Sequence, residues 1–490
     1  MFLRVLPMKT SKVFFQNSQN YSIFVLYQYN MSRVKPSIAK GTRDFSPEIL
    51  NKRNFLKSHL VDVFESFGFQ PIETPSFERS ETLLGKYGEE GDRLIFKILN
   101  SGDKVRNADL EALQKGALAQ FSNSLSQKAL RYDLTVPFAR YVAQYQNDIQ
   151  FPFRRYQIQN VWRADRPQHG RFQEFLQCDA DVVGEKSLWQ EIEGVLIYDR
   201  VFSKLGLKGI QIQLNHRKIL AGIAQCIGVE SQLIDFTVAL DKLSKIGEQG
   251  VIEELKKKGF SMDSLSRLQP FLSLEGDFET QLSAVAKILE SFDDAHEGID
   301  ELRFIFEQLK RQSLKAVSLS LDITLARGLN YYTGLILEVI PPGEIKMGSI
   351  GGGGRYDHLT DLFGLKNTSG FGISFGFDRI YLVMEELDLF PSSLNQNTQL
   401  LFLNFGRETA EVCFETLTKL RDQQLPSEIY PVAVKLKKQL NYADQRSIPH
   451  VVILGPEEFQ NGIFILKEMK TGKQSEYSIS EMLQVLGQLS

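Results

Sequence analysis

Four segments of the chain are rich in charged, glycine and aromatic residues, more than a plain hydrophobic core needs: residues 130–137, 163–181, 325–334 and 370–379. Each contains arginine, which stays charged and binds the oxygens of phosphate and carboxylate groups bidentately. The chemistry open to these residues is therefore the binding of anions. Taken alone, each segment is better explained by a surface arginine or a glycine turn, because a single motif is weak evidence.

Residues 155–163 and 172–183 are predicted to form a hairpin of two strands, joined by a charged loop at 164–171. Because side chains alternate across a strand, the second strand has one largely apolar and one polar face. The apolar face, interrupted by Glu174, holds Phe172, Leu176, Cys178, Ala180 and Val182, and the polar face holds Gln173, Phe175, Gln177, Asp179 and Asp181. The polar face either meets solvent, as in many antiparallel sheets, or lines a cleft. The strand by itself favours solvent.

The elements around this hairpin follow from the spacing of apolar residues. A helix is predicted over 47–67, where Ser46 and Pro47 are helix-start signals, and a short strand over 69–74 follows it. Residues 231–312 are rich in Glu, Lys, Leu and Ser at helical spacing and predict a separate helical insertion. Strands are predicted over 316–326, 331–340 and 370–375, with a helix over 378–387. A glycine cluster at 348–354 lies between the second and third of these strands.

A second, smaller unit is predicted after a linker composition at 389–397. Strands over 400–404, 427–431 and 450–455 alternate there with helices over 408–422 and 433–446. A β-ribbon over 462–478 and a helix over 479–489 end the chain. This alternation predicts an α/β sandwich of about 90 residues. The whole chain is thus predicted as a mixed α+β body with a helical insertion and a C-terminal α/β domain.

The bulk composition is that of an ordinary globular protein, with 42% hydrophobic and 24% charged residues. A net charge of −3 argues against a protein that coats nucleic acid non-specifically, although a local basic face remains possible. Cys178, Cys226 and Cys413 are far apart and the six histidines are scattered, so neither a disulfide framework nor a zinc site is expected. No stretch reaches the roughly 18 apolar residues of a membrane span.

The first 43 residues contain no acidic residue, and this basic leader has three interpretations. It is typical of a transit peptide. Its apolar cluster at 21–27 is too short for a signal anchor. The third interpretation, which we prefer, is that the gene model starts too early and that Met31 is the real start, because a domain-like sequence follows it at once. Residues 1–35 are expected to be a disordered leader or the product of a mis-annotated start.

Together, the four segments resemble the signature motifs of class II aminoacyl-tRNA synthetases, from Lys40 to the C-terminus. Residues 40–47 resemble the opening segment of the histidyl-tRNA synthetase family, and the helix and strand that end at Pro75 resemble motif 1, the dimer element. Residues 155–181 resemble motif 2 and residues 370–379 resemble motif 3. The sequences Arg-Gly-Leu-Asn-Tyr-Tyr at 327–332 and Gly-Gly-Gly-Arg-Tyr-Asp at 352–357 match two segments that are diagnostic for the histidine family.

The resemblance implies an α+β fold in which a six-stranded antiparallel catalytic sheet is flanked by helices. The catalytic core would comprise residues 36–228 and 314–390, with a helical insertion at 229–313 and an α/β anticodon-binding domain at 397–490. In this fold the polar strand face is the floor of the active site, so the resemblance reverses the preference for solvent.

The resemblance also implies a reaction: the ATP-dependent ligation of L-histidine to tRNA(His) through histidyl-adenylate, with release of AMP and pyrophosphate. ATP would be a substrate with Mg²⁺, and no tightly bound cofactor and no protein-held metal such as zinc are expected. Phosphoryl chemistry works mainly by positioning and electrostatics, which explains the arginines. Arg163 and Arg327 are the implied catalytic residues at the α-phosphate, and the implied ATP-binding residues are Arg163, Asp165, Arg171, Phe175 and Arg379.

The histidine pocket follows from the same resemblance. The ammonium group would meet Asp133, Thr135 and Gln177, with Leu134 in the same segment. The imidazole would meet Asp181 and the aromatic walls of Tyr331 and Tyr332, while Arg163 and Arg327 reach the carboxylate end. A pocket that hydrogen-bonds its substrate strongly rejects analogues that lack the bonding group.

Four positions depart from the usual pattern of the family. Asp133, Asp165 and Asp378 stand where Glu is usual, and Asn330 stands where Asp is common. The three aspartates keep the charge with a shorter reach, and no required group is lost.

The implied partners are tRNA(His), L-histidine, ATP and a second copy of the chain, without a membrane, in the cytoplasm. The basic helix at 433–446 offers lysines for phosphates and a ring for base stacking, in Lys435, Lys437, Lys438 and Tyr442. Without the resemblance, a solvated basic helix face explains this segment equally well.

Two alternatives to the active ligase remain. One is a catalytically inactive paralogue that senses histidine or uncharged tRNA; such proteins usually lose the ATP-binding arginines or the C-terminal domain, and this chain keeps both. The other is a class II synthetase for a different amino acid, such as threonine or proline. The tyrosine pair after Arg327 argues against it.

Overall fold

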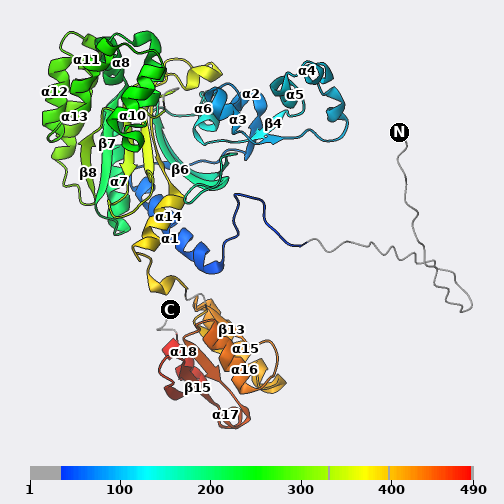
Figure 1. Ribbon diagram of the computed structural model, residues 1–490. Coiled ribbons are helices and arrows are strands. Elements are labelled where there is room, and N and C mark those ends of the chain that lie inside the picture. Colours follow the sequence, from blue (N-terminus) through cyan, green and yellow to red (C-terminus); the bar gives the residue numbers. More distant parts are fainter. Residues whose placement is uncertain (1–34, 329–330, 396–397, 487–490) are drawn as a thin grey trace, which may run out of the picture. The chain divides into compact units, whose positions relative to one another are not determined.

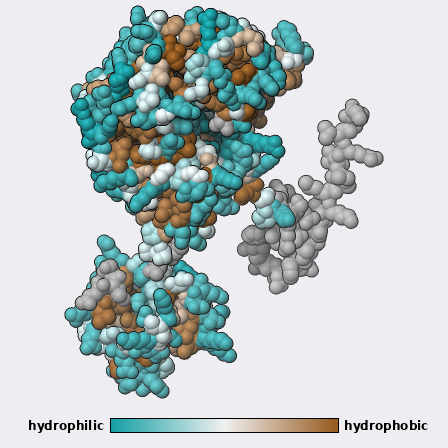
Figure 2. All heavy atoms as spheres, turned by 60° about the vertical axis from the view of Figure 1, so that its left-hand side comes forward, coloured by the Kyte–Doolittle hydropathy of each residue, from teal (hydrophilic) through white to brown (hydrophobic). Residues whose placement is uncertain are grey.

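The computed structural model describes residues 35–328, 331–395 and 398–486 (Figure 1). Residues 1–34, which make up nearly all of the predicted leader, and Asn330 lie outside the described residues. No helix in the described ranges is long and apolar enough to cross a membrane. On the face drawn in Figure 2, hydrophilic residues cover most of the surface, and hydrophobic residues show in smaller patches between them.

The main sheet has eight strands in the order β1-β5-β6-β11-β10-β9-β7-β8. Their bounds are β1 (Gln70–Pro71), β5 (Phe153–Trp162), β6 (Glu174–Val183), β11 (Gly370–Phe375), β10 (Gly351–Tyr356), β9 (Leu335–Ile340), β7 (Ile210–His216) and β8 (Val317–Leu321). The six strands from β5 to β7 pair antiparallel, whereas β1 and β8 pair parallel to their neighbours. The antiparallel six-stranded sheet is therefore confirmed, and the structure adds a parallel strand at each edge.

No helix or strand was predicted for the glycine cluster at 348–354. Its second half begins the central strand β10, which pairs with β9 and β11. Glycine is a poor strand former, and it persists where another backbone approaches closely. At Gly353 a Cβ atom would lie 2.3 Å from the carbonyl oxygen of Gly372 on β11. The close packing of β10 against its neighbours therefore requires glycine here.

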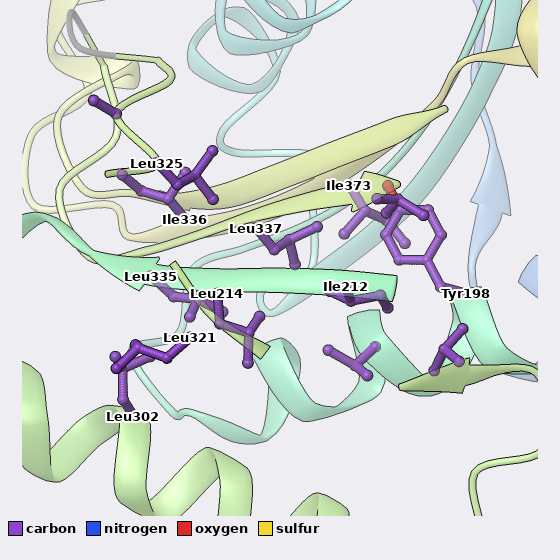
Figure 3. Packing of buried hydrophobic residues seen from close by; sticks show 14 of the residues in the cluster. Tyr198, Ile212, Leu214, Leu302, Leu321, Leu325, Leu335, Ile336, Leu337 and Ile373 are labelled. Atoms are coloured by element: carbon purple, nitrogen blue, oxygen red, sulfur yellow. The ribbon is translucent and has the colours of Figure 1, made fainter. Parts of the chain in front are cut away.

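One face of the main sheet is apolar and is covered by helices. Helix α1 (Pro47–Ser66) begins at Ser46, whose hydroxyl accepts a hydrogen bond from the backbone of Ile49, and it buries Leu56, Leu60, Val63 and Phe64. With α1, helices α7 (Trp189–Lys204), α8 (Arg217–Cys226), α13 (Asp293–Lys310) and α14 (Phe377–Glu386) contribute to the same hydrophobic core. Figure 3 shows this core where Leu214, Leu321 and Leu335 of the sheet lie near Leu302 of α13.

The segment predicted to be helical is helical, and it lies between β7 and β8 in the chain. It comprises α9 (Leu233–Leu240), α10 (Leu243–Lys257), α11 (Met262–Leu272) and α12 (Phe278–Ile288), followed by α13. A 3-10 turn, η2 (Glu230–Gln232), precedes α9. Helix α13 packs along α8 and β7, so the last helix of the insertion belongs to the core of the body.

A small three-stranded sheet precedes the β5–β6 hairpin and was not predicted. Its strands are β2 (Phe77–Arg79), β4 (Lys128–Leu130) and β3 (Lys97–Ile98), in the order β2-β4-β3. Short helices connect them: α2 (Ser80–Leu83), α3 (Gly88–Arg93), η1 (Gly102–Asn107), α4 (Leu110–Gln114) and α5 (Leu118–Ser124). Helix α6 (Thr135–Gln144) follows β4, and η3 (Thr360–Phe363) packs against α6.

The C-terminal part has its own five-stranded sheet, in the order β13-β12-β14-β15-β16. The strands are β12 (Leu400–Phe402), β13 (Ser427–Ile429), β14 (His450–Ile453), β15 (Ile463–Glu468) and β16 (Gln474–Ser478), preceded by η4 (Ser392–Asn395). The helices are α15 (Arg407–Asp422), α16 (Leu436–Gln445), α17 (Pro456–Asn461) and α18 (Ile479–Leu486). Two separate buried clusters, one with Phe402 and one with Leu401, show that this sheet is covered on both faces.

Candidate active site

The polar face of β6 is the floor of a cavity of about 500 Å³. The solvent-facing alternative for this face is therefore wrong. The cavity is lined by every residue predicted to bind histidine or ATP except Leu134: Asp133, Thr135, Arg163, Asp165, Arg171, Phe175, Gln177, Asp181, Arg327, Tyr331, Tyr332 and Arg379. Leu134 precedes α6 as its N-cap residue, and its side chain is fully buried in the protein interior.

Four arginines from separate segments face this one cavity: Arg163, Arg171, Arg327 and Arg379. Burial lowers the pKa of Arg379, and the positive charges of Arg327 and Arg171 lower it further. Like charges repel one another, and such a group is stable only where the rest of the fold holds it in place. The arrangement favours a ligand with several negative charges close together.

Backbone carbonyl groups and aromatic rings fix two of these arginines. Arg379, in the first turn of α14, donates to the carbonyl oxygens of Gly170 at 3.2 Å and Ser349 at 2.6 Å. Arg163 donates from Nε to the carbonyl oxygen of Tyr132 at 3.0 Å, and its guanidinium carbon lies 4.3 Å from the centre of the Tyr132 ring. Neither arrangement neutralises the guanidinium charge, so both arginines remain available to an anion.

The other two arginines pair with carboxylates. Arg171 lies 3.3 Å from Asp165, and Arg327 lies 2.7 Å from Glu338 of β9. Both arginines are about half exposed, whereas Asp165 and Glu338 are buried. The exposed part of each guanidinium is therefore open to a ligand in the cavity, while the buried carboxylate holds the arginine in place.

Just before α6, Asp133 is a half-buried carboxylate in the cavity wall. Its Oδ1 accepts hydrogen bonds from the Tyr87 hydroxyl at 2.9 Å and from the backbone of Val136 at 3.1 Å. Burial raises the pKa of Asp133, while the charge of Arg163 and these hydrogen bonds oppose the rise. Sequence reasoning missed Tyr87, because the segment around it has no regular apolar spacing.

On the floor, Asp181 is already paired within the protein. Its Oδ2 lies 2.6 Å from the Arg155 guanidinium, and its Oδ1 accepts a hydrogen bond from the Tyr356 hydroxyl at 2.8 Å. Burial raises the pKa of Asp181, and the charge of Arg155 opposes the rise. These bonds hold the carboxylate in one orientation beside the cavity. Tyr356 lies in a diagnostic segment, although the sequence assigned it no role.

Two glycines make room for the side chains of the cavity. Gly372 of β11 pairs with Asp181 in the sheet, and a Cβ there would lie 2.1 Å from the Asp181 carboxylate. Gly328 has a positive φ of 64°, and a Cβ there would lie 2.0 Å from the ring of Tyr332. The rings of Tyr332 and Tyr331 lie 4.3 Å apart and tilt by 50°. Gly328 therefore leaves room for the aromatic wall, and Gly372 leaves room for the Asp181 carboxylate.

Asp378 joins the three segments that resemble the class II motifs. Its Oδ1 accepts hydrogen bonds from Arg43 and from Arg53 of α1, at 2.8 and 2.5 Å. Its Oδ2 accepts one from the backbone of Leu176 on β6. The shorter aspartate at this position therefore still reaches its partners. Through them it holds the start of α14, which carries Arg379, against α1 and the cavity floor.

The predicted tRNA-binding residues lie in the C-terminal part, away from this cavity in the chain. Lys435, Lys437 and Lys438 are exposed at the beginning of α16, and no acidic residue stands in its first turn. Tyr442 is half-buried: its ring lies edge-on to Tyr430 at 5.3 Å, and its hydroxyl bonds to Arg446. The lysines, together with the positive helix N-terminus, suit phosphate groups, whereas the Tyr442 ring is already packed.

Within the residues that the structure describes, no three His, Cys, Asp or Glu side chains gather as ligands for a metal ion. The three cysteines are free, and two of them, Cys178 and Cys413, are buried.

Comparison with known proteins decides the family. A family model described as histidyl-tRNA synthetase matches residues 41–107 and 112–380, and a model described as anticodon binding domain matches residues 397–489. The chain belongs to the histidyl-tRNA synthetase family. It is 58% identical to the histidine–tRNA ligase of Christiangramia forsetii, over 90% of this chain and 97% of that protein. It is 54% identical to the corresponding ligase of Flavobacterium johnsoniae, over 90% of this chain and 96% of that protein.

Solved structures of the family share the fold. The crystal structure of a histidyl-tRNA synthetase from a Nostoc species matches with a TM-score of 0.77 and 28% identity, over 94% of this chain and all of that one. The Staphylococcus aureus family member matches with a TM-score of 0.65 at 18% identity, over 92% of this chain and 100% of that one, which shows a common fold alone. The match to the Nostoc structure therefore extends over nearly the whole of this chain.

Proposed function

We propose that this chain joins L-histidine to tRNA(His) in two steps, with ATP as the energy source. In the first step a carboxylate oxygen of histidine bonds to the α-phosphorus of ATP while the bond to the bridging oxygen breaks, which releases pyrophosphate. In the second step a ribose hydroxyl at the 3′ end of the tRNA attacks the carbonyl carbon of histidyl-adenylate, and AMP leaves. One observation carries the proposal: four arginines and a polar, tyrosine-walled pocket share one cavity.

The arginines would supply the positive charge that the first step requires. Attack by a carboxylate on a triphosphate brings two anions together, so preorganised positive charge stabilises the transition state. We assign Arg163 and Arg327 to the α-phosphate and the substrate carboxylate, and Arg379 to the γ-phosphate. Phe175, which lines the same cavity, would stack on adenine, with Arg171 and Asp165 completing the nucleotide contacts.

The other end of the cavity would select the amino acid. Asp133, Thr135 and Gln177 are assigned to the ammonium group. Asp181, whose orientation is fixed by Arg155 and Tyr356, is assigned to an imidazole nitrogen. Tyr331 and Tyr332 provide the aromatic wall. Leu134 would contribute only through its backbone, because its side chain is buried elsewhere.

ATP would enter as its Mg²⁺ complex. Magnesium keeps most of its waters and is commonly held by substrate phosphates with one or two carboxylates. Asp165 lines the cavity and could supply such a carboxylate. Bound there, the ion would neutralise phosphate charge, next to the arginines that do the same.

The remaining partners follow from the family and from the C-terminal part. We propose that the lysines at the start of α16 bind phosphates of the tRNA. We also propose a homodimer, formed through the elements that resemble motif 1, namely α1 and β1. Light scattering should then give twice the chain mass of 55.8 kDa, and a monomeric mass would overturn this proposal.

ATP–pyrophosphate exchange tests the function, with each of the twenty amino acids offered separately to the purified full chain. Exchange with histidine alone is the expected result. Histidine binding without exchange would favour the inactive paralogue, and exchange with another amino acid would favour a different class II synthetase. The arginines in the cavity support the active ligase over the paralogue.

A further inference from the structure

Asp179 lies in the middle of the cavity floor and has no role in the assignments above. It stands between Gln177 and Asp181 on the polar face of β6, and it pairs in the sheet with Gln157 of β5 and Ser374 of β11. Its side chain lines the cavity, yet the residue is only 3% exposed. A carboxylate at this place is buried in the protein but faces the space left for a ligand.

The two oxygens of Asp179 differ in their contacts. Oδ2 accepts a hydrogen bond of 2.6 Å from the amide nitrogen of Gln177. Oδ1 is buried and has no hydrogen-bond partner among the described residues, and the same holds for the amide oxygen of Gln177. The Ser374 side chain contributes a hydrogen bond to the carboxylate that lowers its pKa, but Oδ1 itself has no partner among the described residues. A buried carboxylate oxygen without a partner is costly, so a ligand that supplies a donor would be stabilising.

The surroundings of Asp179 contain more negative than positive charge. Arg155 of β5 faces it, but this guanidinium pairs directly with Asp181. Asp181 and Asp133 add negative charge from β6 and from the start of α6, and the other titratable groups that face it are the phenols Tyr198, Tyr331 and Tyr356 and the Cys178 thiol. Burial raises the pKa of Asp179 to about 7, and the charge of Arg155 limits the rise.

This inference rests on the proposed function, since a free amino acid brings one ammonium group into the cavity. We propose that Asp179 is a further substrate-binding residue: its free Oδ1 receives the ammonium group of histidine, while its Oδ2 holds the amide of Gln177 toward the same group. The ammonium group supplies the missing positive charge and the missing donor together. Asp179 therefore adds a second carboxylate to Asp133 in recognising the free α-amino group.

The substitution Asp179→Asn tests this role, because it removes the charge and keeps the shape. The KM for histidine in the exchange assay should rise by roughly ten- to a hundred-fold, the usual effect of losing a hydrogen bond to a charged group, with a smaller change in kcat. The matched control is Glu174→Gln on the same strand, whose carboxylate bonds to Asn160 and Trp162 outside the cavity. The control should leave the KM unchanged.

Two inhibitors separate the ammonium contact from a structural effect. Histidinol keeps the ammonium group of histidine, whereas imidazole-4-propionate keeps the ring and the carboxylate but lacks the ammonium group. Asp179→Asn should weaken inhibition by histidinol and leave inhibition by imidazole-4-propionate unchanged. An equal loss for both inhibitors, or no loss for either, would overturn the proposal.

Proton release gives an independent readout. An ammonium group beside Asp179 favours its ionised form, so histidine binding near pH 7 should expel a proton from the carboxyl group. Calorimetry in two buffers of different ionisation enthalpy should show more proton release in the wild type than in Asp179→Asn, and equal release would contradict the role.

The two proposals fail separately. If the wild type shows no histidine-dependent exchange, the proposed function is overturned. If exchange is normal and the KM for histidine is unchanged in Asp179→Asn, only the role of Asp179 is overturned.

Discussion

At the scale of single residues, the cavity brings together four arginines, whose positive charges repel one another when no anion is bound. This repulsion is evident at Arg379, whose pKa is lowered first by burial and then by the positive charges of Arg327 and Arg171. A fold that holds such groups together gives up some stability for function. The arginines lie where a polyanion would neutralise them, as the proposed reaction requires.

Arg327→Ala should lower histidine-dependent exchange by roughly a hundred-fold or more, the usual effect of removing one preorganised charge at a reacting phosphate. The fold should persist, because Arg327 is half exposed and, within the described residues, its ion pair is with Glu338. Exchange kinetics and thermal melting measure the two effects. The matched control is Arg303→Ala, a half-exposed arginine on α13 outside the cavity. An unchanged exchange rate in Arg327→Ala would remove Arg327 from the mechanism.

Asp179 also predicts a dependence of stability on pH. Its pKa of about 7 in the folded chain exceeds the ordinary 3.8, so the folded state holds an extra proton between these values. Stability therefore falls as pH rises through this window, and the loss is complete above it. Asp179→Asn should melt at a higher temperature than the wild type at pH 8, with a smaller gain at pH 5. A variant that is less stable at pH 8 would contradict this account.

Most of the cavity residues could be predicted from the sequence, because they lie in short segments with a recognisable local pattern. Arg163, Arg327 and Arg379 each stand in a short segment with its own glycine and aromatic pattern. Tyr87 and Arg155 could not be predicted, because their partners Asp133 and Asp181 are distant in the chain and are brought together only by the folded sheet. The polar alternation of β6 did contain a signal for Asp179, which shares a face with Gln177 and Asp181.

At the scale of elements, β10 is a strand that the spacing of apolar residues did not predict. Glycine is a poor strand former, and the pairing with β9 and β11 makes a strand of this segment. Strand propensity depends on packing more than on intrinsic preference. Helix α1 is the opposite case: apolar spacing, Ser46 and Pro47 predicted it to within one residue at its C-terminus.

Gly353→Ala tests the packing of β10. A Cβ at this position would lie 2.3 Å from the carbonyl oxygen of Gly372, which must move to admit it. Overpacking of this kind typically costs about 1–3 kcal/mol or more, so the melting temperature should fall by several degrees. At Gly343, in a loop, a Cβ would meet nothing within 4 Å, so Gly343→Ala is the control and should change little. Equal melting temperatures for the two variants would contradict the close approach.

At the scale of the whole molecule, the catalytic body and the C-terminal part have separate hydrophobic cores. Within the described residues, the buried clusters of the body include no residue beyond Phe390, and those of the C-terminal part begin at Leu400. The linker between them was visible in the sequence, because Pro, Ser and Asn concentrate there. The three-stranded sheet around β4 was not visible, since its strands are two or three residues long.

These separate cores predict that a chain ending at Asn395 will fold and keep histidine-dependent exchange. The truncation retains η4, whose Leu394 carbonyl accepts a hydrogen bond from Asn51 of α1. Charging of tRNA(His) should be lost, because the basic start of α16 is removed. Exchange and aminoacylation, measured on the same preparation, separate the two steps. Undiminished charging by the truncated chain would contradict the role given to the C-terminal part.

The central claim is that one cavity holds the activated nucleotide and the histidine together. A crystal structure of the full chain with a non-hydrolysable analogue of histidyl-adenylate measures this directly. The account predicts one analogue molecule, with its phosphate-like group between Arg163 and Arg327 and its imidazole against Tyr331 and Tyr332. An analogue bound elsewhere, or in this cavity without touching those arginines, would contradict it.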